Sequence, residues 1–263
     1  MSSKRKSSRP ASTSWDPLAR WYDGWVGKDG SKHHQNLAIP AVLELLDPQR
    51  GEEILDVGAG TGVLAPFVSK AGAHYTGIDA SEKLLQMARQ HHQKQGKFIF
   101  GDARRLSAHP ELGAGYFDGV VFLLSIQDMD PLGEVVENAA WALKPGGRVV
   151  ILMTHPSFRV PRQSGWGWDE DRKLQFRRVD RYLTPLPVPL KPYPGQSGVS
   201  RSFHRPLHEY INTLAKNHLW VDQVLEIPTY KSSARGPRAK AENLANQEIP
   251  LFLGLRARKV LSG

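Results

Sequence analysis

The residues with the clearest capacity for chemistry form a glycine run after a short apolar stretch. Glu53-Ile54-Leu55-Asp56-Val57 leads directly into Gly58-Ala59-Gly60-Thr61-Gly62. Glycine lets the backbone turn tightly and approach a ligand closely, because no Cβ stands in the way. Free amide groups at the start of a following helix would then face the ligand. The run therefore predicts a binding loop between a strand and a helix.

A glycine-rich turn of this kind also occurs in proteins that bind nicotinamide or flavin dinucleotides. Their pattern has glycine at its first, third and sixth positions. The sixth position counted from Gly58 is Val63, where a third glycine would allow close packing of helix on strand. The missing glycine counts against a dehydrogenase.

Three aspartates end three successive predicted strands. Asp56 ends the first, Asp79 follows Thr76-Gly77-Ile78, and Asp102 follows Phe100-Gly101. Acids at strand ends also cap helices, and Ser81 with its neighbours is such a candidate cap. The three acids together, with the glycine loop and the turn Lys144-Pro145-Gly146-Gly147, are hard to obtain by capping alone.

The run Asp56-Val57-Gly58-Ala59-Gly60-Thr61-Gly62 resembles the first motif of class I S-adenosylmethionine-dependent methyltransferases, and residues 51–153 carry nearly all of the resemblance. It implies S-adenosylmethionine as the cofactor, with Asp56 and the glycine backbone around its methionine part. Asp79 would accept both ribose hydroxyls, and Asp102 would lie beside the adenine amino group. The cofactor-binding residues predicted in this way are Tyr22, Asp56, Gly58, Ala59, Gly60, Gly62, Asp79, Ala80, Asp102, Ala103, Leu124 and Ser125.

The loop after the fourth predicted strand is the second candidate for chemistry. In an open parallel sheet, ligands lie at the carboxyl ends of the strands, so residues 124–130 should face the transferred methyl group. Gln127 and Asp128 could act there or could only cap the next helix. The Asn-Pro-Pro-Tyr type of sequence, seen here in many amino-group methyltransferases of nucleic acids and proteins, is absent, which counts against that subclass.

A general base is needed if the acceptor is an oxygen of high pKa. His155, directly after the fifth strand, is the first candidate and His204 the second, with a structural role as the alternative for both. The histidines lack the spacing of a metal site, so no metal is predicted. Tyr22 resembles the lid aromatic of many small-molecule methyltransferases of this class, although core packing would also explain it.

Alternating strands and helices must position these residues. The periodicity predicts strand 53–57, helix 62–71, strand 74–78, helix 81–93, strand 97–100, strand 117–123, helix 132–143 and strand 147–153. Such alternation is typical of a parallel sheet with helices on both faces. The predicted fold class is therefore α/β, a Rossmann-like doubly wound sheet that is mostly parallel with an antiparallel last strand.

The flanking segments complete the predicted organisation. Residues 1–14 are Ser-rich and basic and predict a disordered tail, and residues 15–50 predict N-terminal lid helices, the second over 34–46. Residues 51–154 form the cofactor-binding core. Residues 155–205 are rich in Pro and Trp without a clear period and predict an inserted substrate cap. Residues 206–263 complete the core with a helix and two strands, near 220–227 and 249–258, joined by a loop of about twenty residues.

Charge is unevenly distributed along the 263 residues. Residues 155–263 hold 18 basic and 9 acidic side chains, which favours an anionic acceptor, either a small acid or a nucleic acid, with a solvated basic face as the alternative. No run of eighteen apolar residues and no apolar N-terminal segment is present, so we expect neither a membrane span nor a secretory signal, and a cytoplasmic location. Cysteine is absent, which excludes disulfides.

The sequence thus predicts a methyltransferase acting on a small molecule, because the Trp- and Pro-rich cap could wall a closed pocket. Arg159, Arg162, Arg201 and Arg205 could hold an anionic acceptor, or be surface charge. Two alternatives stay open: an RNA methyltransferase that uses the basic C-terminal portion, and a non-catalytic cofactor-binding scaffold, since a fold does not imply a function.

Overall fold

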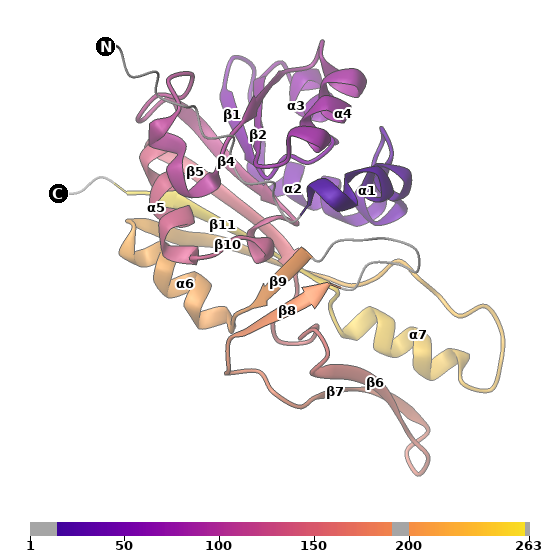
Figure 1. Cartoon of the computed structure of the whole chain (residues 1–263). Helices are drawn as coiled ribbons and strands as arrows, with labels where there is room; N and C mark the ends of the chain where they lie inside the picture. Colours follow the sequence, from indigo (N-terminus) through magenta and orange to yellow (C-terminus); the bar gives the residue numbers. More distant parts are fainter. Residues whose placement is uncertain (1–14, 191–199, 261–263) are drawn as a thin grey trace, which may run out of the picture.

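A seven-stranded sheet forms the centre of the computed structural model, which describes residues 15–190 and 200–260 (Figure 1). The strands lie in the order β10-β11-β5-β4-β1-β2-β3. Their bounds are β1 Glu53–Val57, β2 His74–Asp79, β3 Lys97–Phe100, β4 Phe117–Leu123, β5 Leu143–Thr154, β10 Leu219–Ile227 and β11 Phe252–Lys259. The predicted disordered tail and residues 191–199 of the predicted cap lie outside the described residues.

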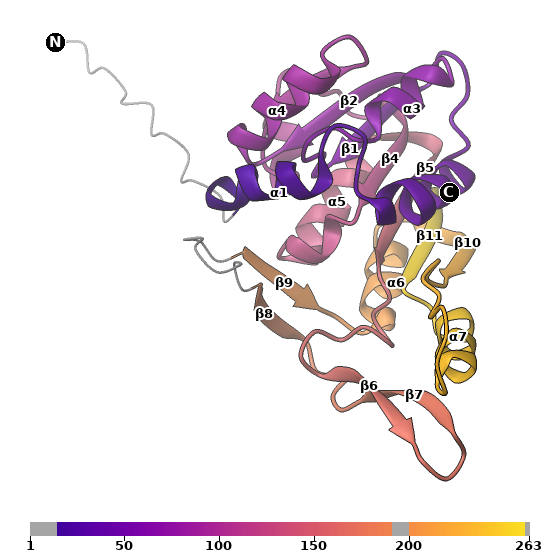
Figure 2. The ribbon, with the colours of Figure 1, turned by 90° about the vertical axis from the view of Figure 1, so that its right-hand side faces the viewer.

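Helices cover both faces of this sheet (Figures 1 and 2). The α-helices are α1 Ala19–Val26, α2 Ile39–Leu46, α3 Ala65–Lys70, α4 Glu82–His92, α5 Leu132–Ala142, α6 Leu207–Lys216 and α7 Ala239–Glu248. Shorter helical turns are η1 Asp16–Leu18, η2 His34–Ala38, η3 Ala103–Ala108 and η4 Ile126–Asp128. The helix predicted over 34–46 is therefore η2 followed by α2.

The strand period of two divides the apolar side chains between two cores. Leu55 and Val57 of β1 face a core that includes residues of α5 and α6. Ile54 of the same strand faces a second core, built with α2 and α3. Neighbouring strands repeat the division, since Val120 belongs to the first core and Val121 to the second. Both faces of the central strands are therefore buried, as a doubly wound sheet requires.

Strand pairing confirms the predicted fold class. β5, β4, β1, β2 and β3 are parallel to their neighbours, whereas β11, the last strand of the chain, runs antiparallel between β5 and β10. The chain runs outward from β1 through β2 to β3 and then returns to β4 on the other side of β1. This reversal of strand order opens a crevice at the carboxyl ends of β1 and β4, where ligands bind in sheets of this kind.

The structure differs from the sequence-based expectations outside the central strands. The connection between β10 and β11 is not a plain loop but contains α7. The predicted cap, whose sequence shows no clear period, holds two antiparallel hairpins, formed by β6 Ser164–Asp169 with β7 Leu174–Val179 and by β8 Leu186–Leu190 with β9 Ser200–His204. α3 begins three residues after the glycine run, and β5 begins before the predicted turn at 144–147.

The β6–β7 hairpin lies at the end of the molecule farthest from α3 and α4 in both views (Figures 1 and 2). Arg159 and Arg177 lie over the Trp166 ring at 5.0 and 5.2 Å from its centroid, and Arg238, next to α7, lies 4.5 Å from that of Trp168. The Arg177 contact lies within the hairpin, whereas those of Arg159 and Arg238 join the hairpin to the rest of the protein. The division of the chain into a core and a cap stays a prediction.

The part of the chain that the structure describes contains no helix with the length and apolar character needed to cross a membrane. The cytoplasmic location stays a prediction.

Candidate active site

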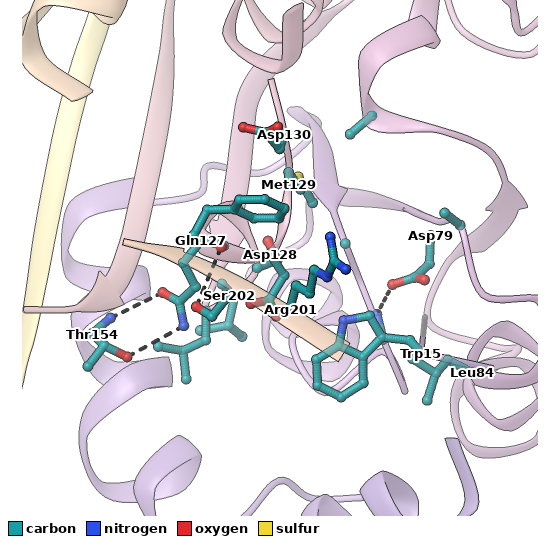
Figure 3. Close-up of a pocket in the computed structure, with 18 of the residues that line it drawn as sticks. Trp15, Asp79, Leu84, Gln127, Asp128, Met129, Asp130, Thr154, Arg201 and Ser202 are labelled. Carbon is teal, nitrogen blue, oxygen red and sulfur yellow. Dashed lines mark hydrogen bonds between the residues drawn. The ribbon is translucent and has the colours of Figure 1, made fainter. Parts of the chain in front are cut away.

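A cavity of about 1170 Å³ lies at the carboxyl ends of the parallel strands (Figure 3). Its wall at one end comes from the glycine loop and from the ends of β2 and β3. Its wall at the other end comes from residues 123–125 and 127–130 and from β9, while Tyr22 of α1 lies over the glycine loop. We call these the cofactor end and the acceptor end. The sheet topology thus brings the two candidate regions of the sequence to one cavity.

The glycine loop has the backbone that the sequence predicts. Gly58, Gly60 and Gly62 have φ angles of 77°, 55° and 77°, in the left-handed region that favours glycine. A Cβ on Gly58 would lie 2.6 Å from the Cβ of Ser125, so this glycine allows the loop after β4 to approach. Gly58 and Gly60 line the cavity, whereas Gly62 packs against Phe98 and Ala88.

The loop amides do not point freely at a ligand, in contrast to the expectation. The amides of Gly58 and Ala59 donate to the Ile78 carbonyl at 2.8 and 3.1 Å, and the Gly62 amide donates to Ala59. The Gly60 amide donates to Oδ2 of Asp79 at 2.9 Å. These hydrogen bonds fix the loop against β2. The loop therefore offers a ligand a closely fitting surface and few free amide donors. α3 starts too late for its amides to serve in their place.

Asp79 ends β2 on the cavity wall, and Ala80 beside it also lines the cavity. Its two oxygens accept from the amides of Gly60 and Ser81 at 2.9 and 2.8 Å, which fixes the carboxylate plane. Burial raises the pKa of Asp79, and the hydrogen bonds from these amides oppose the shift. Each carboxylate oxygen keeps a further lone pair. The group can therefore accept from two neighbouring hydroxyls at once.

Asp102 combines a capping role with a place on the cavity wall. It caps η3 by accepting from the Arg104 amide at 2.9 Å, and it holds the Arg104 guanidinium at 2.6 Å. This guanidinium is the main reason that the pKa of Asp102 is lowered. Ala103 lines the cavity beside it. Capping, considered as an alternative, is therefore present here and at Ser81, which accepts from the Leu84 amide.

Asp56 lies behind the glycine loop and not on the cavity wall. Its side chain is buried, with Oδ2 accepting from the Tyr75 hydroxyl at 2.7 Å, while Oδ1 has no hydrogen-bond partner among the described residues. Burial raises the pKa of Asp56 to about 7. Ala59 and Gly62 are also absent from the cavity lining. Direct contact of these three residues with a cofactor stays a prediction.

Tyr22 of α1 lies over the glycine loop. Its ring is 3.5 Å from where a Cβ of Gly60 would stand, and burial together with Asp79 and Asp128 raises the pKa of its hydroxyl. α1 is held against α4 by an ion pair between Asp23 and His91 at 2.9 Å. Trp15, Trp21 and Trp25 extend the aromatic lining from the same segment. A lid role for Tyr22 and its segment stays a prediction.

The two histidine candidates lie in different environments. His155 is buried outside the cavity lining, with Nε2 bonded to Glu226 at 2.9 Å and Nδ1 accepting from the Ser157 amide at 3.2 Å. Both ring nitrogens are thus used, and the geometry favours the structural alternative. His204 lines the cavity, and its Nε2 donates to the Tyr182 carbonyl at 2.6 Å. A catalytic role for either stays a prediction.

The loop after β4 supplies side chains to the acceptor end. Leu124 and Ser125 line the cavity, and Ser125 is tied to the Val57 carbonyl at 2.6 Å. Gln127 is bound to Thr154 of β5 on both sides of its amide, at 3.3 and 3.4 Å (Figure 3). α5 is preceded by Pro131 without a side-chain cap, so Gln127 and Asp128 do not cap it.

Three of the four arginines that could hold an anionic acceptor reach the cavity. Arg205 is buried and paired with Asp130 at 2.7 Å, and Arg159 donates to the carbonyls of residues 249 and 250. Arg201 lines the cavity without an ion pair to any described acid, and Arg162 instead donates to the Pro189 carbonyl away from the lining. Within residues 15–190 and 200–260, no cluster of three or more metal-ligating side chains occurs.

Sequence reasoning missed the contribution of β9 to this site. Ser202 and Phe203 line the acceptor end, with the Ser202 hydroxyl 3.5 Å from the Gln127 carbonyl. Burial alternates along β9, but its buried residues Ser200, Ser202 and His204 are polar, so the local sequence carries no apolar alternation that could have revealed the strand.

Comparison with known proteins agrees with this geometry. A family described as "Methyltransferase domain" matches residues 55–151. An S-adenosylmethionine-dependent methyltransferase from Mesorhizobium loti, of known structure, is 26% identical with a TM-score of 0.66, and the match covers 88% of this chain and 100% of that one. The chain carries a class I S-adenosylmethionine-dependent methyltransferase domain.

Two relatives of this methyltransferase domain are named for quinone biosynthesis. The chain is 32% identical over 132 residues to a ubiquinone biosynthesis O-methyltransferase of Sodalis glossinidius, covering 50% of this chain and 53% of the relative. It is 33% identical over 117 residues to a demethylmenaquinone methyltransferase of Tropheryma whipplei, covering 44% and 48%. The chain thus spans about half the length of these relatives.

The residues of the methyltransferase domain fit S-adenosylmethionine. The glycine loop exposes a surface without side chains at Gly58 and Gly60, and Asp79 offers two fixed acceptor oxygens beside it. Behind the glycine loop, Oδ1 of Asp56 is a buried acceptor atom without a hydrogen-bond partner among the described residues. Bound there, the cofactor would supply an electrophilic methyl group.

Proposed function

We propose that this chain is an enzyme that transfers a methyl group from S-adenosylmethionine to a small aromatic molecule carrying a hydroxyl group. One observation carries the proposal: a single cavity runs from the cofactor end at Gly60 and Asp79 to an acceptor end where the aromatic side chains of Phe203 and Tyr210 lie among a few charged groups. Such concave, largely apolar sites with a few polar groups are typical of small-molecule sites. The relative named a ubiquinone biosynthesis O-methyltransferase supports an acceptor oxygen, and the relative named a demethylmenaquinone methyltransferase supports only an aromatic ring system.

The chain's own residues would bind, orient and enclose the reactants. A sulfonium methyl group is already reactive, so the protein mainly aligns the acceptor oxygen and excludes water. Trp15 and Tyr22 cover the cofactor side, and Phe203 faces them from β9. In this proposal residues 51–154 hold the cofactor, and residues 155–205 cover the acceptor.

The charge distribution argues against the RNA alternative. Many basic side chains of the C-terminal portion are paired with acids, as in Arg256 and Arg258 with Asp222, and Arg238 with Glu170. Such pairs leave less positive field for a phosphate backbone. An anionic group on a small acceptor instead has Arg201, a cation on the cavity wall without an ion-paired acid among the described residues.

The test is transfer of a deuterated methyl group from labelled S-adenosylmethionine to a panel of hydroxylated benzenes, followed by mass spectrometry. The proposal expects a product heavier by one labelled methyl group, formed by the wild type and not by Asp79→Asn. The same assay with total RNA distinguishes the alternative, because labelled nucleosides and no labelled small molecule would overturn the proposal. Tight cofactor binding without transfer to any acceptor would favour a scaffold.

A further inference from the structure

The side chain of Asp128 lies where an acceptor would meet the methyl group. It ends η4, three residues after Ser125, whose Cβ nearly touches Gly58 of the cofactor end. The residue is half-buried and lines the cavity (Figure 3). Arg201 lies in the same part of the cavity, between Asp128 and Asp79 in this view. Asp128 therefore faces both ends of the cavity.

The loop that carries Asp128 is fixed from both sides. Its amide donates to the Ser125 carbonyl at 2.9 Å, and its neighbour Gln127 is bonded to Thr154 of β5. From the β9 side, the Arg205 guanidinium donates to the Met129 carbonyl at 2.7 Å. A carboxylate on so constrained a backbone keeps a defined position, as a group that exchanges a proton with a bound acceptor must.

The surroundings of Asp128 differ from those of the other acids at the cavity. Asp102 is paired with Arg104, and Asp130 with Arg205. Asp128 forms no ion pair with a described residue. The titratable and charged groups around it are Tyr22 from α1, Tyr210 from α6 and Arg201 from β9. The Ser202 hydroxyl of β9 lies 3.5 Å from the Gln127 carbonyl and also close enough to the Asp128 carboxyl group to lower its pKa. Burial raises the pKa of Asp128 to about 7, with the Ser202 hydroxyl opposing the shift.

We propose that Asp128 is the general base of the methyl transfer, and that Ser202 is a positioning residue that holds its carboxylate toward the acceptor. The inference rests on the proposed function. The acceptor O–H bond breaks and its proton goes to a carboxylate oxygen of Asp128. The freed electron pair on the acceptor oxygen forms the new bond to the methyl carbon, while the electrons of the broken methyl–sulfur bond stay on sulfur, which changes from a sulfonium to a neutral thioether.

Two acceptors of different acidity test this role. 4-Propylcatechol is a neutral phenol near pH 7 and needs a base, whereas the nitro group of 4-nitrocatechol makes its hydroxyl far more acidic, so that it ionises without help. Asp128→Asn should lower kcat/KM about 10²–10⁴-fold with 4-propylcatechol, and less than about 10-fold with 4-nitrocatechol. For the wild type, kcat/KM with 4-propylcatechol should rise with pH to a plateau above about 7, because the base must be deprotonated. Asp128→Asn should lose this rise.

The matched control is Asp171→Asn, which removes an exposed carboxylate in the turn between β6 and β7, outside the cavity lining. It should keep both the pH rise and the wild-type ratio between the two acceptors. Ser202→Ala should move the pH rise upward, because it removes the hydrogen bond that lowers the pKa of Asp128, and Ser202→Thr should restore it. An equal loss with both acceptors in Asp128→Asn, or a pH rise that persists in it, would overturn the proposal and direct attention to His204.

A readout without turnover separates this inference from the proposed function. Carboxyl ¹³C NMR of the full chain with S-adenosylhomocysteine should show one aspartate signal that titrates near pH 7, shifts when 4-nitrocatechol is added, and is missing in Asp128→Asn. Titration of that signal only in the usual acidic range would contradict the role of Asp128. If the wild type methylates neither catechol, the proposed acceptor class fails, while the NMR result still decides whether Asp128 is a titrating group at the cavity.

Discussion

At the cofactor end of the cavity, backbone amides fix the Asp79 side chain, whereas at the acceptor end side chains from distant segments fix the loop after β4. Asp79 is bound by two amides, one from the glycine loop and one from the start of α4. Asp128 and Ser202 come from segments more than seventy residues apart in the sequence. A site built on backbone geometry can serve one constant ligand, while a site built from separate side chains can change with the acceptor.

The strongest test of this comparison places a side chain in the glycine loop. Gly58→Ala combines a positive φ, which costs about 1–2 kcal/mol, with a Cβ 2.6 Å from that of Ser125, which costs about 1–3 kcal/mol more. We expect the free energy of unfolding to fall by the sum and binding of S-adenosylhomocysteine to be lost. Urea denaturation and calorimetry measure the two effects.

Gly146→Ala is the matched control, since Gly146 has the same φ of 77° but no atom within 4 Å of where its Cβ would stand. Its free energy of unfolding should fall only by the part that the positive φ causes, and it should bind S-adenosylhomocysteine normally. Equal losses in the two variants would show that close approach at Gly58 is unimportant.

The second prediction concerns Asp79 alone. Asp79→Asn removes the negative charge and replaces one acceptor oxygen by an amino group that donates. It should weaken binding of S-adenosylhomocysteine about 10–100-fold, as expected for the loss of a charge-assisted hydrogen bond. Titration calorimetry measures the Kd, with Glu82→Gln on the exposed side of α4 as the control. Unchanged affinity in Asp79→Asn would show that the ribose does not bind the Asp79 carboxylate.

The third prediction addresses the acceptor end. Arg201→Ala should raise the KM for an acceptor that carries a carboxylate about 10-fold, because it removes one charge-assisted contact, and leave the Kd of the cofactor unchanged. Arg162→Ala, which changes an arginine outside the cavity lining, should alter neither. A larger effect of Arg201→Ala on the cofactor than on the acceptor would contradict the division into two ends.

The smallest expected effect concerns the contact that holds α1 over the cofactor end. Asp23→Asn breaks a partly exposed pair with His91, worth about 0.2–1 kcal/mol. S-adenosylhomocysteine should dissociate about 2–5-fold faster in a stopped-flow displacement experiment, while Arg89→Ala, which breaks another pair on α4, should not change the rate. Equal rates in the wild type and Asp23→Asn would show that α1 does not act as a lid.

The same contrast explains what the sequence could predict. The strand from Glu53 to Val57 has the predicted bounds, because alternating apolar residues and a glycine boundary are local signals. Asp79 could be predicted as a site residue because it stands at the end of a predicted strand. The hairpins β6–β7 and β8–β9 were missed because all four strands are short, β6 contains glycine, β8 contains proline, and polar residues make up half of β7 and most of β9. α7 buries only Ala245, so its sequence lacks an apolar stripe.

The position of a histidine in the sequence does not by itself predict a catalytic role. His155 follows β5 as predicted, but Glu226, far along the chain on β10, binds its Nε2. Asp128 was a candidate by its place after β4, yet the features that distinguish it depend on burial under α1 and on Ser202 of β9. Contacts between residues that distant arise from the topology and are not visible in local sequence.

The most direct test of the central claim is a crystal structure of the full chain with S-adenosylhomocysteine. The account predicts the ribose hydroxyls within hydrogen-bond distance of the Asp79 carboxylate, the homocysteine part along Gly58 and Gly60, and the sulfur directed toward Asp128. A ligand bound elsewhere, or in this cavity with its sulfur turned away from the loop after β4, would contradict it.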